Sequence, residues 1–240
     1  MNLCNPTRDD GFAAQYQNIL FTMVFCELNG DNFIYRPFNK IAHNYNNVPN
    51  FVRDKENFIN LINSFETTIQ ANKSKIEYRD VNNRVSYNVV ESYINMLAHS
   101  RLFEKAKSLL NEGKKSKFDK SIKNIAVHIR RSNPHDIGSY AYSDNQKFLD
   151  IIEEIRKNTP EDKLIHIYSQ GDIKDFEIFR SGDTIFHLNE KTEDTFYDLV
   201  CSDVLVCSKS SFSYTAGLLS MAKVYYIPFW HRVPSCWEKF

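Results

Sequence analysis

The strongest candidate for chemistry is the stretch 125–133, where two adjacent arginines follow an apolar segment and precede a loop. Residues 125–129 predict a buried strand, and side chains at the carboxyl end of such a strand face the ligand crevice of an α/β sheet. Arg130 is always charged and presents a planar fork of donors, which suits a diphosphate. The motif therefore predicts an anion site. The alternative is that Arg130 and Arg131 are a solvated pair that ends the strand.

Three serines surround Phe212 where a second predicted strand turns into a helix, within residues 210–213 of the segment 207–215. The first turn of a helix presents free N–H groups and the positive end of the helix dipole, and both favour phosphate. The hydroxyls of Ser210, Ser211 and Ser213 would add donors. A single serine at this place is also a common N-cap, so simple capping is the alternative.

A third strand end, residues 168–172, carries Gly171 and Asp172. Gly171 permits a tight turn, and Asp172 could hold a ribose or the edge of a base. For this segment alone an ordinary turn after a strand is the favoured interpretation.

A polar loop, residues 8–15, leads into a predicted helix. Gly11 allows the backbone to approach a ligand closely. Asp9 or Asp10 could act as a general base beside an acceptor hydroxyl. Capping of the helix by an acidic residue explains the same pattern equally well.

The histidines and cysteines show no metal-ligand spacing. The five cysteines are odd in number and scattered, without a Cys-x-x-Cys pair, so neither a zinc site nor a disulfide framework is predicted. His128 lies inside a predicted strand, where a core histidine with a satisfied hydrogen bond is more common than a catalytic one. We therefore expect no metal and no resident cofactor.

Alternating strands and helices in the C-terminal half predict an α/β fold with a parallel sheet. Strands are predicted at 125–129, 164–168, 203–207 and 224–227, with helices opened by Ser143 (in a capping box with Gln146) and by Thr192, and over 211–221. The N-terminal half is less regular, with helices at 11–28, 57–65 and 89–110, a strand at 33–35, and a strand or loop at 80–87. A lysine run at 114–120 predicts a solvated linker, which divides the chain into residues 1–118 and 119–240.

The composition predicts a soluble protein with one sizeable core or two small lobes, since 42% of the 240 residues are hydrophobic and the formal net charge is zero. Apart from the lysine run, no predicted element concentrates basic residues, so no nucleic-acid partner is expected. No apolar stretch approaches the roughly 18 residues of a membrane span. Residues 1–8 lack the features of a signal peptide, so we expect a cytoplasmic protein without a transmembrane segment.

In their order and spacing the four motifs resemble the fucosyltransferase superfamily, which includes α1,2-, α1,6- and protein O-fucosyltransferases. Residues 128–133 are similar to the family's His-x-Arg-Arg-(Gly/Thr)-Asp motif, and residues 203–213 to its Ser-Ser-Phe-Ser phosphate motif. Residues 164–172 resemble the strand that ends in an Asp near the nucleotide, and residues 11–15 resemble the family's N-terminal glycine loop. The similarity is dense over residues 124–220.

Several positions depart from the family pattern. Asn133 stands where the family has Asp, and Ala13 and Ala14 stand where it has Gly and Asn. The pair at 170–171 interrupts the third motif, and the chain is short for the family.

The resemblance implies two Rossmann-like lobes of the GT-B type, with a small, mainly helical acceptor-side lobe before the nucleotide-sugar lobe. It implies an inverting, metal-independent glycosyltransferase that moves a sugar, most specifically L-fucose from GDP-fucose, to a glycan or other hydroxyl acceptor. Arg130 would clamp the diphosphate and Asp10 would match the acidic base of some protein O-fucosyltransferases. The resemblance implies donor contacts for Gly11, Phe12, His128, Arg130, Arg131, Asp172, Ser210, Ser211 and Phe212.

Three alternatives remain. The donor could be another GDP- or UDP-sugar. The chain could be a non-catalytic nucleotide-sugar or glycan-binding module of the same fold. It could also be another anion-using enzyme on a Rossmann-like fold, such as a phosphatase or nucleotidase, although the sequence contains neither a Walker-type glycine loop after the first strand nor a Gly-x-Ser-x-Gly elbow.

Overall fold

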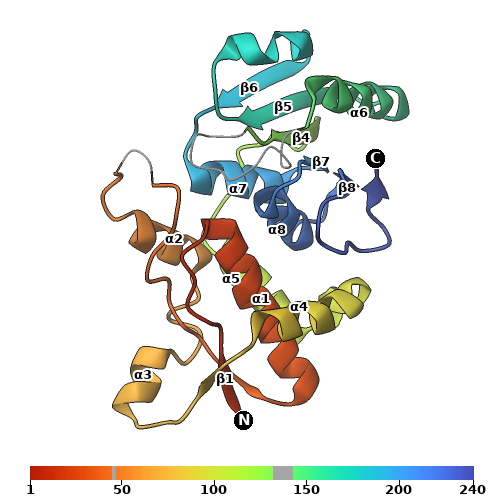
Figure 1. The fold of residues 1–240 in the computed structure, drawn as a ribbon. Helices are drawn as coiled ribbons and strands as arrows, with labels where there is room; N and C mark the ends of the chain where they lie inside the picture. The colour runs from red at the N-terminus through yellow and green to blue at the C-terminus, as the bar shows by residue number, and fades with distance from the viewer. Residues whose placement is uncertain (45–46, 132–142) are drawn as a thin grey trace. The chain divides into compact units, whose positions relative to one another are not determined.

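The computed structural model describes residues 1–44, 47–131 and 143–240, and these divide into two compact units (Figure 1). Unit 1 comprises Met1–Lys115 with Arg232–Pro234, and unit 2 comprises Ser116–His231 with Ser235–Phe240. The division falls three residues before the boundary expected at 118/119 and assigns residues 232–234 to the first unit.

Unit 1 contains a three-stranded parallel sheet in the order β2-β1-β3. Its strands are β1 (Asn2–Cys4), β2 (Asn32–Ile34) and β3 (Arg79–Asp80). The sequence indicated β2, but β1 and β3 have only three and two residues, too few for alternation to show. Cys4 and Ile34 are nearly inaccessible, so the sheet is short but anchored in a core.

Helices make up most of unit 1 and surround α1 (Phe12–Asn29), which is buried on nearly every side. The other helical segments are α2 (Phe51–Ile59), α3 (Thr68–Lys73), α4 (Asn83–Ser92), η1 (Ile94–His99) and α5 (Arg101–Asn111). The predicted helix at 57–65 was wrong in position, because Asn60 adopts a left-handed conformation with φ of 55° and ends α2. The predicted helical stretch at 89–110 is interrupted, because the Ser100 hydroxyl accepts a bond from Phe103 N and starts α5.

Unit 2 is built on a six-stranded parallel sheet in the order β6-β5-β4-β7-β8-β9. Its strands are β4 (Lys123–Ile129), β5 (Lys163–Ser169), β6 (Thr184–Leu188), β7 (Val204–Cys207), β8 (Lys223–Tyr226) and β9 (Glu238–Lys239). Numbered along the unit this order is 3-2-1-4-5-6, the Rossmann order. The chain therefore reverses its direction of travel across the sheet between β4 and β7, and ligands of such sheets bind outside the carboxyl ends at that point.

The two faces of this sheet differ in chemistry because side chains alternate along each strand. One face carries Ile125, Val127 and Ile129 of β4, which share an apolar core with α6 (Asn145–Asn158). The opposite face carries Asn124, His128 and, on β5, His166 and Tyr168. The Tyr168 hydroxyl donates to Asp198 of α7 (Thr192–Cys201) over 3.0 Å, so α7 lies over this polar face.

The expected α/β class, the parallel sheet in the C-terminal part and the mainly helical N-terminal part are confirmed. Two predicted helix caps were wrong. The N-cap of α6 is Asp144 and not Ser143, and that of α7 is Lys191 and not Thr192. The sequence also missed β6, β9 and the short helix η3 (Ile173–Phe179).

Candidate functional site at the switch point of unit 2

Side chains from two neighbouring strands are joined at the reversal of the sheet. β4 pairs with β7 in the register Val127 with Val206, so His128 and Ser208 follow at the same edge. The Ser208 hydroxyl lies 2.9 Å from His128 Nδ1, although 80 positions separate the two residues. This bond ties the end of β4 to the turn after β7. Sequence analysis missed Ser208, whose only local signal is that it directly follows the strand.

The His128 ring is held neutral. Burial, followed by the nearby positive charge of Arg130, lowers its pKa to about 3. The ring also packs against Phe212, with centroids 5.3 Å apart, and Phe212 packs edge-on against Phe196 of α7 at 5.3 Å. His128 thus has the hydrogen bond expected of a core histidine, but it lies next to the predicted anion site.

Helix α8 (Ser211–Leu219) begins at the same edge. Ser210 is its N-cap, and the Ser210 hydroxyl accepts a bond of 3.2 Å from Phe212 N. Ser210 N donates to the Ser208 carbonyl over 2.7 Å, which fixes the turn between β7 and the helix. Capping therefore explains Ser210, while Ser211 and Phe212 remain partly exposed in the first turn. That turn directs N–H groups at the strand ends.

The two arginines of the motif have different surroundings. Arg131 contacts the side chain of Asn145 and lies over the Phe176 ring at 4.7 Å, on the side of the sheet that packs against α6 and η3. Arg130 is partly exposed and exerts its charge on His128, on the opposite face. Arg130 is accordingly the arginine at the switch point, and Arg131 has a packing role. Ser132 and Asn133, which complete the motif, lie outside the described residues.

Asp172 is placed as the cap of η3. Its carboxylate accepts a bond of 3.0 Å from Lys174 N, and it forms a capping box with Asp175. Gly171 has φ of 126° and donates its N–H to the Asn189 side chain at 3.1 Å. The backbone conformation explains the glycine, and the ordinary turn after a strand accounts for this segment.

The predicted N-terminal residues all lie in unit 1. Asp10 pairs with Arg8, whose Nε is 2.9 Å from Asp10 Oδ2 and whose Nη2 also contacts that oxygen. Asp10 Oδ1 is buried and accepts no hydrogen bond from the described residues. The Asp10 backbone carbonyl is held by Gln15 Nε2 at 2.7 Å and by Ala42 N at 3.1 Å. The carboxylate is thus fixed in one position and has one oxygen atom still able to accept a proton.

Gly11 and Phe12 are explained by packing. Gly11 precedes α1, and a Cβ at this position would lie 3.0 Å from the His43 ring. Phe12 is only 4% exposed and contacts the rings of Phe38 and Phe58 at centroid distances of 6.0 Å. Both residues therefore support the loop that carries Asp10.

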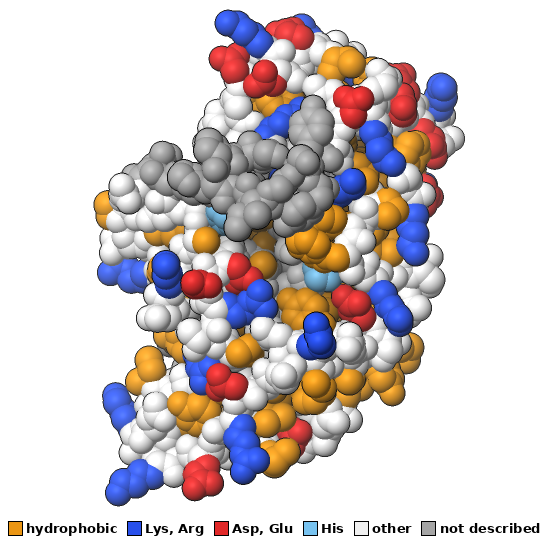
Figure 2. Space-filling model, viewed as in Figure 1, with side chains coloured by type: hydrophobic (Ala, Val, Ile, Leu, Met, Phe, Trp, Pro, Cys, Tyr) orange, Lys and Arg blue, Asp and Glu red, His pale blue; other side chains and the backbone are white. Residues whose placement is uncertain are grey.

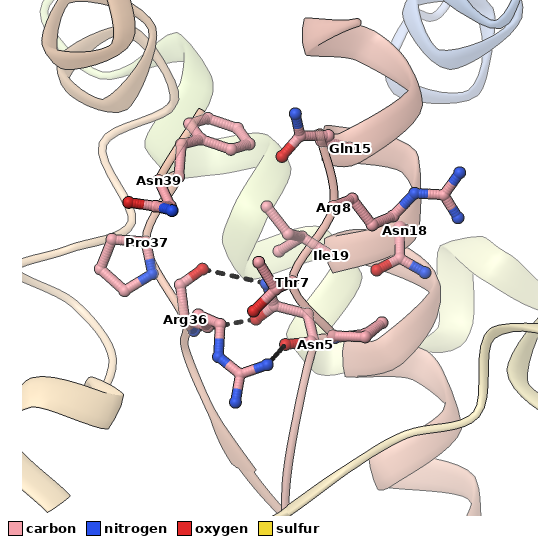
Figure 3. Close-up of a pocket in the computed structure, with 11 residues that line it drawn as sticks. Asn5, Thr7, Arg8, Gln15, Asn18, Ile19, Arg36, Pro37 and Asn39 are labelled. Atoms are coloured by element: carbon pink, nitrogen blue, oxygen red, sulfur yellow. Dashed lines mark hydrogen bonds between the residues drawn. The ribbon is translucent and has the colours of Figure 1, made fainter. Parts of the chain in front are cut away.

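A pocket in unit 1 lies beside the ends of β1 and β2 and is walled on one side by α1 (Figure 3). Its polar lining comprises Asn5, Thr7, Arg8, Gln15, Asn18, Arg36 and Asn39, and its apolar lining comprises Pro6, Ile19, Pro37 and Phe38. Both arginines already face carboxylates, because Arg36 binds Asp80 at 2.7 and 2.8 Å and Arg8 binds Asp10. The pocket therefore offers mainly uncharged hydrogen-bonding groups.

Buried Glu56 holds one wall of this pocket. Its carboxylate accepts bonds from the Tyr35 hydroxyl and, over 2.9 Å, from Phe38 N. Burial raises the pKa of Glu56, and these two donors act against that shift.

Among the residues that the structure describes, no group of three or more His, Cys, Asp or Glu side chains could hold a metal ion. No described helix is both long and apolar enough to cross a membrane. All five cysteines are free thiols. Acidic and basic side chains are interspersed over the face drawn in Figure 2, in keeping with the zero net charge.

No protein-family model matches the chain, and no curated protein matches it. Among solved structures it is similar to NodZ α-1,6-fucosyltransferase soaked with GDP-fucose, at 11% identity and a TM-score of 0.44, over 91% of this chain and 92% of that one. It is also similar to fucosyltransferase NodZ from Bradyrhizobium, at 11% identity and a TM-score of 0.42, over 91% and 93% of the two chains. A third similar structure is NodZ co-crystallized with GDP, at 10% identity and a TM-score of 0.43, with 91% and 92% covered.

Proposed function

We propose that this chain is a glycosyltransferase that takes a sugar from a nucleoside diphosphate, most specifically fucose from GDP-fucose, and transfers it to a hydroxyl of a glycan or similar acceptor. The observation that carries the proposal is the joint position of Arg130, the His128–Ser208 bond and the first turn of α8 at the switch point of a Rossmann-ordered sheet. A diphosphate is the ligand that a guanidinium and a helix N-terminus together favour.

The proposed chemistry is inverting and needs no metal ion. As the bond to the sugar breaks, negative charge grows on the diphosphate, and Arg130 with the N–H groups of α8 stabilises that charge. One donor of this kind is typically worth about 3–4 kcal/mol in the transition state. Neutral His128 can form a hydrogen bond to the ligand without adding a charge that must be desolvated.

In this proposal Asp10 accepts the proton of the attacking hydroxyl through its buried Oδ1. The ion pair with Arg8 engages Oδ2 and orients the Asp10 carboxylate. The uncharged lining of the unit 1 pocket is suited to a hydroxylated acceptor. Because Arg8 already occupies one of the two carboxylate oxygens, the same pair also favours the second candidate, a binding module of this fold without turnover.

The proposal is tested by melting the purified protein with GDP, UDP, ADP and CMP, each with and without its common sugar conjugate and without added metal. A ligand that binds only the native state raises the melting temperature by mass action. We expect a rise with GDP and GDP-fucose, together with release of GDP from GDP-fucose when an acceptor is supplied. A rise with UDP alone would replace GDP-fucose by a UDP-sugar as the donor in this proposal. Binding of a nucleotide without release of GDP would favour the binding module. No rise with any nucleotide would contradict both the glycosyltransferase and the binding module.

A further inference from the structure

A network of polar and titratable side chains covers the polar face of the unit 2 sheet, away from the switch point. It consists of Lys117, Asn124, His166, Tyr168, His187, Glu190 and Asp198, and we call it the Lys117 network. Lys117 follows the division between the units by two residues. Its ammonium is 2.6 Å from Asp198 and 3.6 Å from Glu190, so this member of the lysine run is not simply solvated, as the sequence had suggested.

The network fixes the segment 116–122 to the sheet at several points. Asn124 Nδ2 donates to the carbonyls of Asp119 and Ile122, each over 2.8 Å. The Phe118 ring packs on the His166 ring with centroids 4.8 Å apart. Two of these anchors, Asn124 and Phe118, contact His166 directly, and Ser116 adds a hydrogen bond to Cys201.

The lowered pKa of His166 and its hydrogen-bond partners together define its tautomer. Asn124 uses its amide nitrogen for the backbone carbonyls, so its Oδ1 accepts from His166 Nε2 at 3.2 Å. His166 Nδ1 then carries a lone pair and must accept from His187 Nε2 at 3.0 Å. His187 Nδ1 lies 2.8 Å from the Glu190 carboxylate. His166 is thus the neutral Nε2–H tautomer, with its Nδ1 lone pair facing His187.

Charged and titratable groups surround His166 on this face of the sheet. The Lys117 ammonium lies between the carboxylates of Asp198 and Glu190, and the Tyr168 hydroxyl donates to Asp198 at 3.0 Å. Burial raises the pKa values of Tyr168, Tyr197 and Cys201, so these three groups stay neutral. A proton added to His166 Nδ1 would remove the lone pair that accepts from His187 Nε2 at 3.0 Å.

We propose that the Lys117 network is an acid-sensitive clasp, which holds segment 116–122 on the sheet while His166 is neutral and releases it when His166 takes up a proton. Burial and the charges of His187 and Lys117 lower the pKa of His166 to about 4 when the clasp is closed. In an open clasp the imidazole returns to its ordinary pKa of about 6.5. Because the open form binds this proton more tightly, the equilibrium constant for opening increases about 20-fold when the pH is lowered from 7 to 5.

Asp198 acts in the opposite direction. Burial raises the pKa of Asp198, so this carboxylate binds a proton more readily in the closed form than in the open form. Protonation of Asp198 therefore favours the closed form and offsets part of the release. A variant that removes only the His166 titration therefore isolates the clasp. In His166→Gln the side-chain amide can still donate to Asn124 and its oxygen can accept from His187, without titrating. His99→Gln removes an exposed histidine of η1 and is the matched control.

The experiment measures hydrogen–deuterium exchange of peptides covering 116–122 at pH 7 and pH 5, corrected for the pH dependence of intrinsic exchange. Exchange of β4 peptides serves as the reference for global unfolding. The expected result is a loss of protection of about 20-fold in the wild type and in His99→Gln, with protection kept in His166→Gln. Equal loss in all three proteins, or no loss in the wild type, would overturn the proposal. If His166→Gln is already open at pH 7, nitrogen NMR of the wild-type histidines decides. His166 must then be the neutral Nε2–H form at pH 7, and titration of His166 near pH 6.5 would refute the clasp.

Discussion

Replacing Gly217 by alanine should destabilise unit 2, because α8 has no room for a methyl group at this position. The added Cβ would lie 2.8 and 2.9 Å from two carbons of the Trp237 ring. That ring is 8% exposed and is wedged against Tyr214 and Tyr226, at centroid distances of 5.6 and 5.9 Å, so it cannot swing away. Overpacking of this kind costs about 1–3 kcal/mol, and alanine returns up to about 1 kcal/mol in helix propensity.

Two contacts below 3.0 Å place the overpacking cost in the upper part of that range, about 2–3 kcal/mol, so the net loss is about 1–2 kcal/mol. This corresponds to a fall in melting temperature of about 2–8 °C for a protein of this size. Both tryptophans lie in unit 2, so tryptophan fluorescence during urea or thermal unfolding reports this unit directly.

The matched control is Gly182→Ala, where an added Cβ meets no atom within 4 Å and stability should stay within about 0.5 kcal/mol. A Trp237→Leu background removes the obstructing ring carbons, so Gly217→Ala should cost little there. The reasoning is refuted if Gly217→Ala is as stable as the wild type, or if its cost persists in the Trp237→Leu background.

Three further predictions concern the candidate site. Ser208→Ala leaves His128 Nδ1 without its hydroxyl partner and should lower the free energy of unfolding by about 1–3 kcal/mol. Ser208→Thr keeps the hydroxyl and should cost less. Urea unfolding of both variants measures the difference. The pKa of His128 is lower in the folded protein than in the unfolded chain, so the contribution of neutral His128 to the free energy of unfolding is complete above about pH 6.5 and is lost as the pH falls toward about 3. At pH 5 the loss of unfolding free energy amounts to about 2 kcal/mol. His128→Gln should lose this part of the pH dependence, and an unchanged pH profile would show that His128 is not buried as described. Asp10→Asn should lower fucose transfer by about 100-fold or more while leaving GDP affinity unchanged, and full transfer by this variant would remove Asp10 as the base.

The strand that carries the candidate site was predictable because its pattern is local. Residues 125–129 form a short apolar run that predicts β4, and the alternation of side chains along a strand implies that Arg130 and Arg131 face opposite sides of the sheet. The cap at Ser210 was also visible, since a serine before an apolar helix is an ordinary start signal. These features depend on residues within one turn or one strand of each other.

Features that depend on distant residues were not predictable from the sequence. The His128–Ser208 bond requires β4 and β7 to be neighbours, which is a property of the strand order rather than of either segment. β6 was missed because its residues are only partly buried and include His187, so its hydrophobic pattern is weak. The role of Lys117 depends on partners more than 70 positions away, and a lysine run by itself indicates only solvation.

The central claim, that a nucleoside diphosphate binds at the switch point through Arg130 and α8, is tested most directly by calorimetric titration of GDP and GMP into the wild type and Arg130→Ala. Arg180→Ala, which removes an arginine paired with Glu177 on η3, is the control. A charged hydrogen bond contributes about 1.5–3 kcal/mol, so Arg130→Ala should weaken GDP binding by about 10- to 150-fold. It should also abolish most of the preference for GDP over GMP, with Arg180→Ala unchanged. Equal GDP affinity in the wild type and Arg130→Ala would contradict the account.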